Sequence, residues 1–374
     1  MAPGKGCSMD QHNSAIRAAV AAADRFYRNH LTGSWAAAML TERQLPATAL
    51  GFGYAPPGWS TTTEHLQQQG LSAAVLQEAG ISRRSSTGQL IDAIRDRVTV
   101  TISDTDGPVG FTARRREDAE GPKWLNTATS PIWHKQALLL TDDRGVDPSA
   151  SAMPIVAEGA ADVAAIRAVS ERIHCYAASP CGTALTEQHV DELYRRHPRG
   201  PVALAFDGDD AGRQAALHAW DTLTSRPGFG NRQLLVVDLP SGQDPADLVA
   251  AGAGDELRRR LVTARPLAEL VADLRTSGIH ATDHALRAIA TAERVVGTDW
   301  DRLHPASRQR YVDHLAGRLG LERSTIQQIV ADHISHGCAA PAPSPAPAHR
   351  PDPPASAARA RPPTGVAAAP VRGR

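Results

Sequence analysis

The chain has 374 residues, with 40 lysine plus arginine residues against 40 aspartate plus glutamate residues, and a formal net charge of +0. This length predicts two or three domains of roughly 100–200 residues each, and the charge balance excludes nucleic-acid or membrane binding driven by overall charge. Aromatic residues make up 4% of the chain, which argues against a β-sandwich packed by aromatic side chains.

Cysteine content and hydropathy limit the class of protein further. The four cysteines are scattered and form no Cys-x-x-Cys pair, so we expect free thiols and no zinc ribbon built from this chain alone. We find no signal segment at the N-terminus and no apolar run near the ~18 residues of a membrane span. The sequence therefore predicts a cytoplasmic protein with no zinc and no membrane partner.

The first 150 residues predict helices followed by a β-hairpin. Residues 1–14 are polar and expected to be disordered, and from about Ala15 to Leu31 apolar residues recur at the spacing of one helix face. We expect a second helix over 33–45 with Trp35 and Met39 pointing inward, a tight connector in GFGYAPPGW (51–59), and a helix pair over 62–81. The alternation around DTDG in 96–115 predicts the hairpin.

The rest of the chain changes pattern twice. Between 151 and 254, short apolar segments (PIVA, VALAF, LLVV) alternate with helical ones, which predicts βαβ units and a mainly parallel sheet covered on both faces. Residues 255–336 read as helical; within them 315–330 fits a helix-turn-helix or, the favoured interpretation, an ordinary helical hairpin. Residues 337–374 are rich in proline, alanine and arginine and are expected to be a disordered tail, either solvated or in weak contact with nucleic acid.

Acidic residues follow three of the predicted parallel strands: Glu158, then Asp207 and Asp209, then Asp244 and Asp247. The carboxyl ends of parallel strands lie at one edge of a sheet, where ligands of open α/β sheets bind. Carboxylates that converge there repel one another, and Mg²⁺ or Mn²⁺ would relieve the repulsion. Each motif alone is more often a turn or a helix cap. Together they predict a metal site suited to phosphoryl transfer.

A second signal is the distribution of lysine. Only Lys5, Lys123 and Lys135 are lysines, and two of the three lie in PKWLNTATSPIWHK (122–135). Lysine is a compact charge on a flexible stem, whereas arginine is a rigid fork. The pair is either a phosphate-binding feature or two surface lysines placed by chance, and the distribution of lysine alone leaves both interpretations open.

These motifs, in this order, resemble the catalytic core of bacterial DnaG-type DNA primases, which carry a Toprim domain. The resemblance rests on GFGYAPPGW, DRVTVTISDTDGPVGFTAR, PKWLNTATSPIWHK, the Glu158-Gly159 pair, ASPCGTALTEQHVDEL and the FDGDD motif, over roughly residues 15–335. It implies an α/β protein with an α+β N-terminal subdomain (15–150), a Toprim parallel-sheet domain (151–254) and a helical subdomain (255–336).

The resemblance also implies an activity and its residues. The enzyme would be a DNA-directed RNA polymerase that joins ribonucleoside triphosphates on a single-stranded DNA template with two or three Mg²⁺ or Mn²⁺ ions. Its catalytic residues would be Glu158, Asp207 and Asp209, which with Asp244 and Asp247 would hold metal; Gly159, Gly182 and Gly208 would form turns. Nucleotide and DNA would contact Arg95, Arg97, Arg114, Lys123, Trp124, Asn126 and Lys135.

The sequence departs from the family pattern at two positions and in its extent. Trp124 replaces a tyrosine and keeps an aromatic plane, and Ala246 replaces an aspartate for which Asp247 can substitute. We see no zinc ribbon and no full helicase-binding domain, which suggests a primase of a plasmid, phage or conjugative element, or a core served by a helicase or a separate zinc-ribbon protein.

Three rival functions remain. A Toprim nuclease explains the carboxylates but not the basic segment at 122–135. A catalytically idle single-stranded-DNA-binding protein of a mobile element explains the missing zinc ribbon but not the acidic set. A topoisomerase is disfavoured because no separate nicking-tyrosine domain is visible.

Overall fold

The structure is a computed structural model that describes residues 5–47, 50–134, 139–141, 152–171, 173–182, 184–230, 232–278 and 285–337. Its compact unit spans Met1–His333, and a second unit spans Ile334–Arg374. The expected tail lies, from residue 338 on, outside the described residues. No described helix has the length and apolar character that crossing a membrane requires.

The N-terminal part is an antiparallel sheet in the order β1-β4-β5-β6, with a separate two-stranded sheet of β2 and β3. Helix α1 packs on the four-stranded sheet, and α3 and α4 join the same apolar core. The predicted hairpin is confirmed as β4 and β5. The elements are α1 (Lys5–Asn29), α2 (Trp35–Glu42), β1 (Phe52–Ala55), α3 (Thr61–Gln68), α4 (Ala73–Glu78), β2 (Ser82–Arg84), β3 (Leu90–Asp92), β4 (Arg97–Asp104), β5 (Gly107–Arg115) and β6 (Trp124–Asn126).

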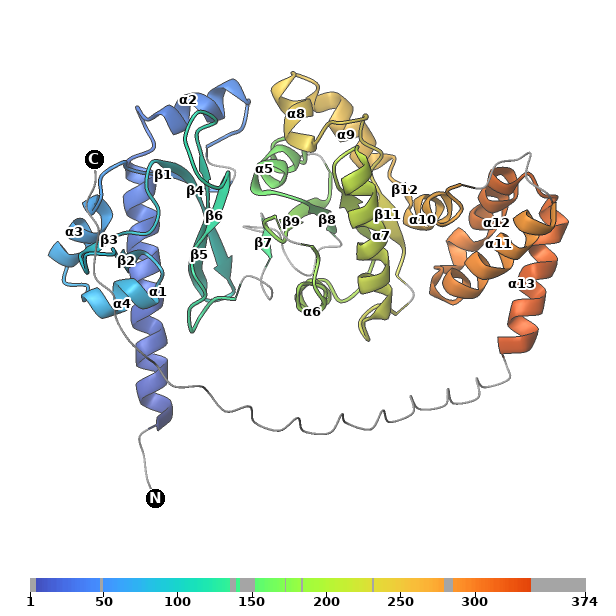
Figure 1. Ribbon diagram of the computed structural model, residues 1–374, viewed down its shortest axis with the longest axis horizontal. Coiled ribbons are helices and arrows are strands. Elements are labelled where there is room, and N and C mark those ends of the chain that lie inside the picture. Colours follow the sequence, from blue (N-terminus) through green and yellow to red (C-terminus); the bar gives the residue numbers. More distant parts are fainter. Residues whose placement is uncertain are drawn as a thin grey trace, which may run out of the picture. The chain divides into compact units, whose positions relative to one another are not determined.

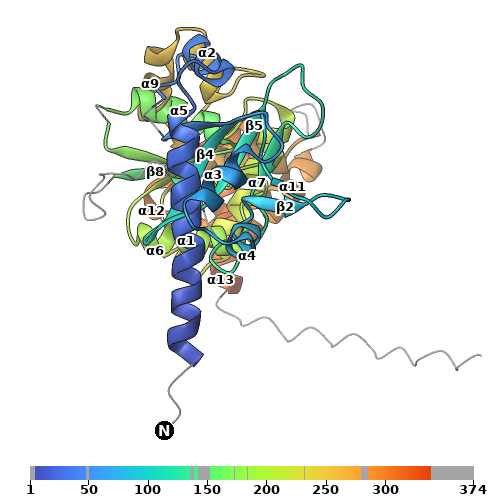
Figure 2. The same cartoon turned by 90° about the vertical axis from the view of Figure 1, so that its left-hand side faces the viewer.

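Helix α1 begins at Lys5, so the expectation of a disordered segment up to residue 14 is wrong for residues 5–14. Its buried face starts at Ile16 and continues through Val20, whereas Met9 is 65% exposed. Once a helix has nucleated, each further residue that becomes helical adds one hydrogen bond. The turns of α1 that pack on the sheet can therefore extend into the polar segment before Ile16. Figure 2 shows the N-terminal end of α1 continuing past the strands on which the helix packs.

The segment expected to be a tight connector contains a strand instead. β1 pairs antiparallel with β4, and Gly53 lies opposite Thr99. A Cβ atom on Gly53 would stand 2.8 Å from Cβ of Tyr27 on α1, so this glycine permits close helix–strand packing. The glycine was therefore a signal of close approach within a strand, not of a turn.

The second part is a sheet in the order β12-β11-β10-β8-β9-β7, parallel from β11 to β9 and antiparallel at both edges. Ile155 and Ala203 face a core shared with α5, α8 and α9, and Val156 and Leu204 face a core shared with α6 and α7. The predicted parallel sheet with two covered faces is thus confirmed (Figure 1). The elements are β7 (Leu140–Thr141), β8 (Met153–Ala157), α5 (Ala160–Val169), β9 (Cys175–Ser179), α6 (Glu187–Arg196), β10 (Val202–Ala205), α7 (Asp210–Ser225), β11 (Leu234–Val236), α8 (Pro245–Ala250), α9 (Gly254–Val262) and β12 (Arg265–Pro266).

The last part is helical, with α10 (Leu267–Arg275), α11 (Ala285–Asp299), the 3₁₀-helix η1 (Trp300–Arg302), α12 (Pro305–Leu319) and α13 (Arg323–Gly337). The expectation that 255–336 is entirely helical misses β12, whose two residues are too few to show a period. Leu315 and Ile326 are fully buried in the same core as α7, which favours the helical-hairpin interpretation of 315–330.

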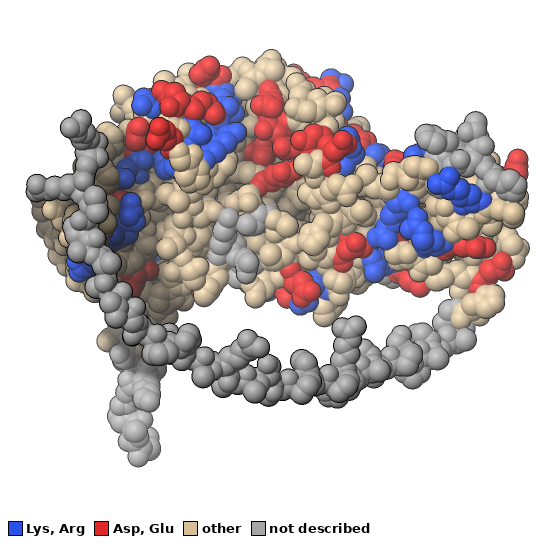
Figure 3. Space-filling model, viewed as in Figure 1, with Lys and Arg blue, Asp and Glu red and all other residues tan. Residues whose placement is uncertain are grey.

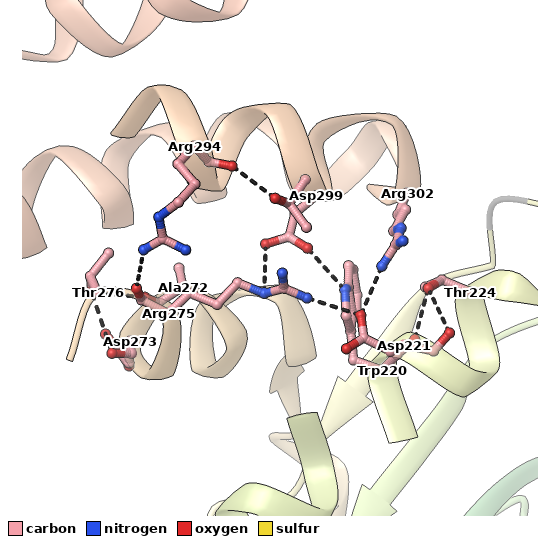
Figure 4. Close-up of polar contacts among 11 residues, drawn as sticks. Trp220, Asp221, Thr224, Ala272, Asp273, Arg275, Thr276, Arg294, Asp299 and Arg302 are labelled. Carbon is pink, nitrogen blue, oxygen red and sulfur yellow. Dashed lines mark hydrogen bonds and ion pairs between the residues drawn. The ribbon is translucent and has the colours of Figure 1, made fainter. Parts of the chain in front are cut away.

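A buried ion pair joins the helical part to α7 (Figure 4). Asp299 is fully buried; its Oδ2 lies 3.2 Å from Nε of Arg275, and its Oδ1 accepts a hydrogen bond from Trp220 Nε1 at 3.2 Å. Burial raises the pKa of Asp299 to about 6, although the charge of Arg275 opposes the rise. Removing one partner would leave a buried charge uncompensated, so this pair fixes α10 against α11, and Trp220 and Asp221 of α7 bond to the same two residues.

Candidate active site

The predicted carboxylates lie where the parallel strands end. Glu158 directly follows β8, Asp207 follows β10, and Asp209 and Asp244 are the N-cap residues of α7 and α8. We call Glu158, Asp162, Asp207, Asp209, Asp244 and Asp247 the acidic edge. On the face in Figure 3, acidic side chains gather over the part of the fold that carries α8, beside a group of basic ones.

Hydrogen bonds to its carboxylate and to its backbone carbonyl hold Glu158 in place. Oε1 of Glu158 accepts a hydrogen bond from the backbone N–H of Asp207 at 3.1 Å. The carbonyl of Glu158 accepts bonds from Ser179 Oγ at 2.8 Å and from the N–H of Gly182 at 3.1 Å. Glu158 is therefore oriented by the ends of two neighbouring strands.

Two of the predicted turn glycines have clear structural reasons. A Cβ atom on Gly208 would stand 2.0 Å from the carbonyl oxygen of Pro240, so only glycine lets the loops after β10 and β11 approach. Gly208 also exchanges hydrogen bonds with that loop, donating to Gln243 and accepting from Gly242 at 3.1 Å each. Gly182 has a φ of +76°, a left-handed conformation that glycine adopts without strain. The third, Gly159, is the N-cap residue of α5 in extended conformation.

Asp162 belongs to the same acidic motif as Glu158, in the first turn of α5, but was not among the predicted catalytic or metal-binding residues. It is 5% exposed, and its carboxylate accepts hydrogen bonds from the N–H of Gly159 at 3.0 Å and of Ala246 at 3.4 Å. It therefore ties the start of α5 to the start of α8, beneath Glu158 and Asp244. An acidic residue three positions after an N-cap is a common capping signal, which hid its second role.

The acidic edge is electrostatically strained. Burial and, after it, the charges of Glu158, Asp244, Asp209 and Asp247 together raise the pKa of Asp207 to about 7. The pKa of Glu158 is raised by burial and by Asp209 and Asp244, and that of Asp162 lies well above its usual range for the same kinds of reason. Among the described residues, no ion pair connects these three carboxylates to a cation. Burial first, and the proximity of like charges second, thus disfavour ionisation of these three carboxylates.

The oxygen ligands of the acidic edge suit hard cations, although the described residues form no ready-made cage around one ion. No three His, Cys, Asp or Glu side chains within the described ranges stand close enough to hold one ion. Mg²⁺ keeps several water ligands and needs only one or two carboxylates, and mutual repulsion of the kind seen here is what such an ion relieves. The donor set therefore fits Mg²⁺ or Mn²⁺ held by few carboxylates and water.

The predicted basic residues divide between two hollows. The first, which we call the basic groove, has a volume of about 970 Å³ and lies on the N-terminal part. The guanidinium of Arg95 stands 3.6 Å from the ring centre of Trp59, which is 65% exposed. Arg97 is 8% exposed and donates to the carbonyls of Pro122 and Lys123 at 3.0 and 3.3 Å. Burial lowers the pKa of both arginines.

Three further residues line or border the basic groove. Arg83 and Arg84 add two cations, and Asn126 adds a buried carbonyl oxygen, Oδ1, that has no hydrogen-bond partner among the described residues. A groove with cations, an exposed indole and a buried unused acceptor has the chemistry of a single-stranded nucleic-acid site.

The second hollow, the bridging pocket, has a volume of about 490 Å³ and lies between the N-terminal part and α8. Arg114 stands in it, 6% exposed, paired with Glu117 and 5.9 Å from the ring centre of Trp124. Trp35 and Met39, expected to point into the core, are only half-buried and line this pocket. The full lining is Trp35, Met39, Glu42, Arg43, Arg114, Arg115, Arg116, Glu117, Asp247 and Ala250.

Arg43 and Arg116 are pocket residues that the sequence interpretation missed. The charge of Arg43 lowers the pKa of Asp244, although burial makes the net shift upward. Near α2, Gln44 donates to the carbonyl of Ala250 at 3.2 Å, so α2 and α8 are in contact. Arg43 lies about 200 positions before the acidic residue that it faces, and no local pattern marks such a pair.

The described residues predicted to contact nucleotide and DNA are thus spread over two hollows. Arg95, Arg97 and Asn126 line the basic groove, and Arg114 lines the bridging pocket. Lys123 is exposed at the start of β6 with its carbonyl bonded to Arg97. Lys135 lies outside the described residues.

Comparisons with known proteins agree with this architecture. Residues 26–144 match the family model described as the N-terminal domain of the DNA primase catalytic core, and residues 155–249 match a Toprim-like model. A DNA primase of Mycolicibacterium smegmatis is 35% identical over 324 residues, which are 82% of this chain and 49% of that protein. The chain thus spans about half the length of the curated relatives it matches.

Solved structures give the same result. The crystal structure of the RNA polymerase domain of Mycobacterium tuberculosis primase DnaG aligns with a TM-score of 0.68 and 31% identity, covering 81% of this chain and 98% of that one. A DnaG primase catalytic domain bound to single-stranded DNA aligns with a TM-score of 0.67 and 25% identity, covering 84% and 99%. The chain therefore belongs to the family of DnaG primase catalytic cores, in which a primase N-terminal domain precedes a Toprim domain.

Proposed function

We propose that this chain catalyses primer synthesis: it joins ribonucleoside triphosphates into short RNA on a single-stranded DNA template, with divalent metal. The observation that carries the proposal is the lining of the bridging pocket. It combines four arginines with Asp247, a residue of the acidic edge that lies in α8. Phosphoryl transfer needs anions held by cations next to a carboxylate-bound metal, and these two surfaces supply both.

The residues divide into three roles. Glu158, Asp207, Asp209, Asp244 and Asp247 would hold Mg²⁺ or Mn²⁺, which would supply charge neutralisation at the transferring phosphate. Arg43 and Arg114 would bind triphosphate in the bridging pocket, with Lys123 and Lys135 contacting phosphate nearby. Arg95, Arg97, Trp59, Trp124 and Asn126 would contact the template by phosphate pairing, base stacking and hydrogen bonding.

The basic groove supports a template role because its parts are sequence-tolerant. Phosphate contacts from arginine position a strand without reading it, and every base can stack on an exposed indole. A relative's structure is described as bound to single-stranded DNA, and its likeness to this chain supports the same class of ligand here.

The direct test is a synthesis assay. The purified chain is incubated with single-stranded DNA, labelled ribonucleoside triphosphates and Mn²⁺ or Mg²⁺, with Glu158→Gln as the matched inactive control. Short labelled oligonucleotides from the parent chain, and none from the variant, are the expected result. Cleavage of the input DNA would favour the Toprim nuclease, and binding without product would favour the idle DNA-binding protein.

The expectations of a mobile-element origin, and of a helicase or a separate zinc-ribbon protein as partner, stay predictions. Co-purification of a tagged chain from its host would identify such partners.

A further inference from the structure

Asp96 stands between two of the arginines of the basic groove, directly before β4. It has a φ of +47°, in the left-handed region that few residues other than glycine adopt. Aspartate tolerates this conformation better than most side chains because its short polar group can bond locally. The backbone N–H of Asp96 donates to the carbonyl of Pro56 at 3.2 Å, so the turn is anchored to the segment after β1.

The left-handed turn decides where the neighbouring arginines go. In a regular strand, residues 95 and 97 would share one face of the sheet. Here Arg95 stacks on Trp59 and Arg97 donates to the carbonyls of Pro122 and Lys123. The two guanidinium groups thereby reach different walls of the same groove.

The carboxylate of Asp96 faces the bridging pocket's residues. Its Oδ1 accepts hydrogen bonds from Trp35 Nε1 and from the hydroxyl of Tyr54, both at 2.6 Å. Its Oδ2 lies 3.7 Å from a guanidinium nitrogen of Arg116, which in turn stands 5.7 Å from the ring centre of Trp35. Trp35 and Arg116 both line the bridging pocket.

We propose that Asp96 is a positioning residue that serves both hollows: its left-handed backbone sets the arginines of the basic groove, and its carboxylate sets Trp35 and Arg116 in the bridging pocket. The inference deepens the proposed function, on which it rests, by assigning template and triphosphate binding to two separable properties of one residue.

The two properties can be separated by substitution. Asp96→Gly keeps the left-handed turn and removes the carboxylate, whereas Asp96→Ala removes the carboxylate and disfavours the turn. Asp96→Asn tolerates the turn and keeps an oxygen that accepts from Trp35 or Tyr54, and loses only the charge. A matched control is Asp104→Asn, because Asp104 is a half-buried carboxylate at the far end of the same hairpin, bonded to Arg17 at 2.6 and 3.0 Å.

Two constants, the Kd for single-stranded DNA and the KM for ribonucleoside triphosphate, are measured for each variant. Affinity for single-stranded DNA is read from fluorescence anisotropy of a labelled oligodeoxythymidylate without metal, and KM for ribonucleoside triphosphate from oligonucleotide synthesis. For Asp96→Gly we expect a DNA Kd within about twofold of the parent but KM raised about fivefold, the size of one typical lost hydrogen bond. For Asp96→Ala both constants should rise about fivefold, since a non-glycine side chain in this region carries a penalty of that order.

Asp96→Asn should bring both constants back to within about threefold of the parent, and Asp104→Asn should leave both unchanged while lowering the melting temperature. Equal DNA affinity for the Gly and Ala variants, or effects that merely follow melting temperature as in Asp104→Asn, would overturn the inference. If Asp96→Ala does not fold, Gly against Asn still decides: equal KM values overturn the inference. A parent chain that neither binds the oligonucleotide nor makes product refutes the proposed function itself, before any variant is compared.

Discussion

The acidic edge and the predicted nucleotide- and DNA-binding arginines Arg95, Arg97 and Arg114, which we call the basic surface, carry opposite charges and are built in opposite ways. Each arginine of the basic surface already has a local partner: Arg97 has two carbonyls, Arg114 has Glu117, and Arg95 has the ring of Trp59. The carboxylates of Glu158 and Asp162 accept backbone N–H bonds, but Glu158, Asp162 and Asp207 have, among the described residues, no cationic partner. The charges of the basic surface already have partners, whereas the acidic edge holds like charges close together.

This difference shows how a site can prepare for two kinds of ligand. Anionic template and nucleotide must displace the weak local partners of the arginines. The arginine side chains must therefore be oriented before the ligand binds. A divalent cation instead removes repulsion that the fold has already imposed, so its affinity comes partly from relief of that repulsion. The predictions below test the two halves separately.

The largest expected effect is on catalysis at the acidic edge. Glu158→Gln keeps the side chain's shape and its bond to the N–H of Asp207 but removes one negative charge, so primer synthesis should fall by about 100-fold or more. Melting temperature should stay equal or rise, because the like-charge repulsion decreases. Product yield and a thermal melt check this; wild-type yield would remove Glu158 from the catalytic set.

The next effect concerns the two lysines of segment 122–135. Lys123→Ala and Lys135→Ala should each lower synthesis about tenfold, the size of one charged phosphate contact. Lys123 is exposed, so its substitution should change the melting temperature little, because exposed cations add little to folding. Lys→Arg at either position should also impair synthesis, since the guanidinium is larger and planar. Lys5→Ala is the control. If both arginine variants are as active as the parent, the scarcity of lysine was not a functional signal.

A smaller effect is expected on template affinity. Binding of single-stranded DNA should weaken steeply with salt, and Arg95→Ala should weaken it a few-fold and lower the logarithmic salt slope by about 0.7, one phosphate contact. Anisotropy titrations over a range of ionic strength measure both quantities. A parent chain whose affinity is equal at low and physiological salt would contradict the role given to the basic groove.

The smallest effect is the pH dependence of stability at the acidic edge. The folded pKa of Asp207, about 7, lies above its ordinary value of 3.8, so the folded state holds more protons between these values and stability falls as pH rises through this range. In chelator, the melting temperature should therefore rise by a few degrees from pH 7.5 to 5.5. Asp207→Asn should flatten this rise. Asp299 and His314, whose pKa values are also raised, contribute in the same direction and are unchanged in the variant.

Much of the acidic edge could be predicted from the sequence, because its geometry is local. Parallel strands end at one edge, so a carboxylate directly after β8, one two positions after β10, and one capping α8 are expected to meet there. The hairpin and the alternation of strands with helices were equally readable, since both follow from periods of 2.0 and 3.6 residues.

The arrangement of the basic surface was decided only by tertiary structure. Arg43 faces Asp244, far along the chain, and Asp96 has an unusual backbone angle; neither feature leaves a periodic trace, and nor does the bond from Ala246 to Asp162 of the acidic edge. The same holds for the division of the predicted arginines between two hollows, which depends on how α2 and α8 meet. A sequence determines which charges sit at the ends of its own strands, whereas the partner of an arginine is set by whichever distant surface folding brings within a few ångströms.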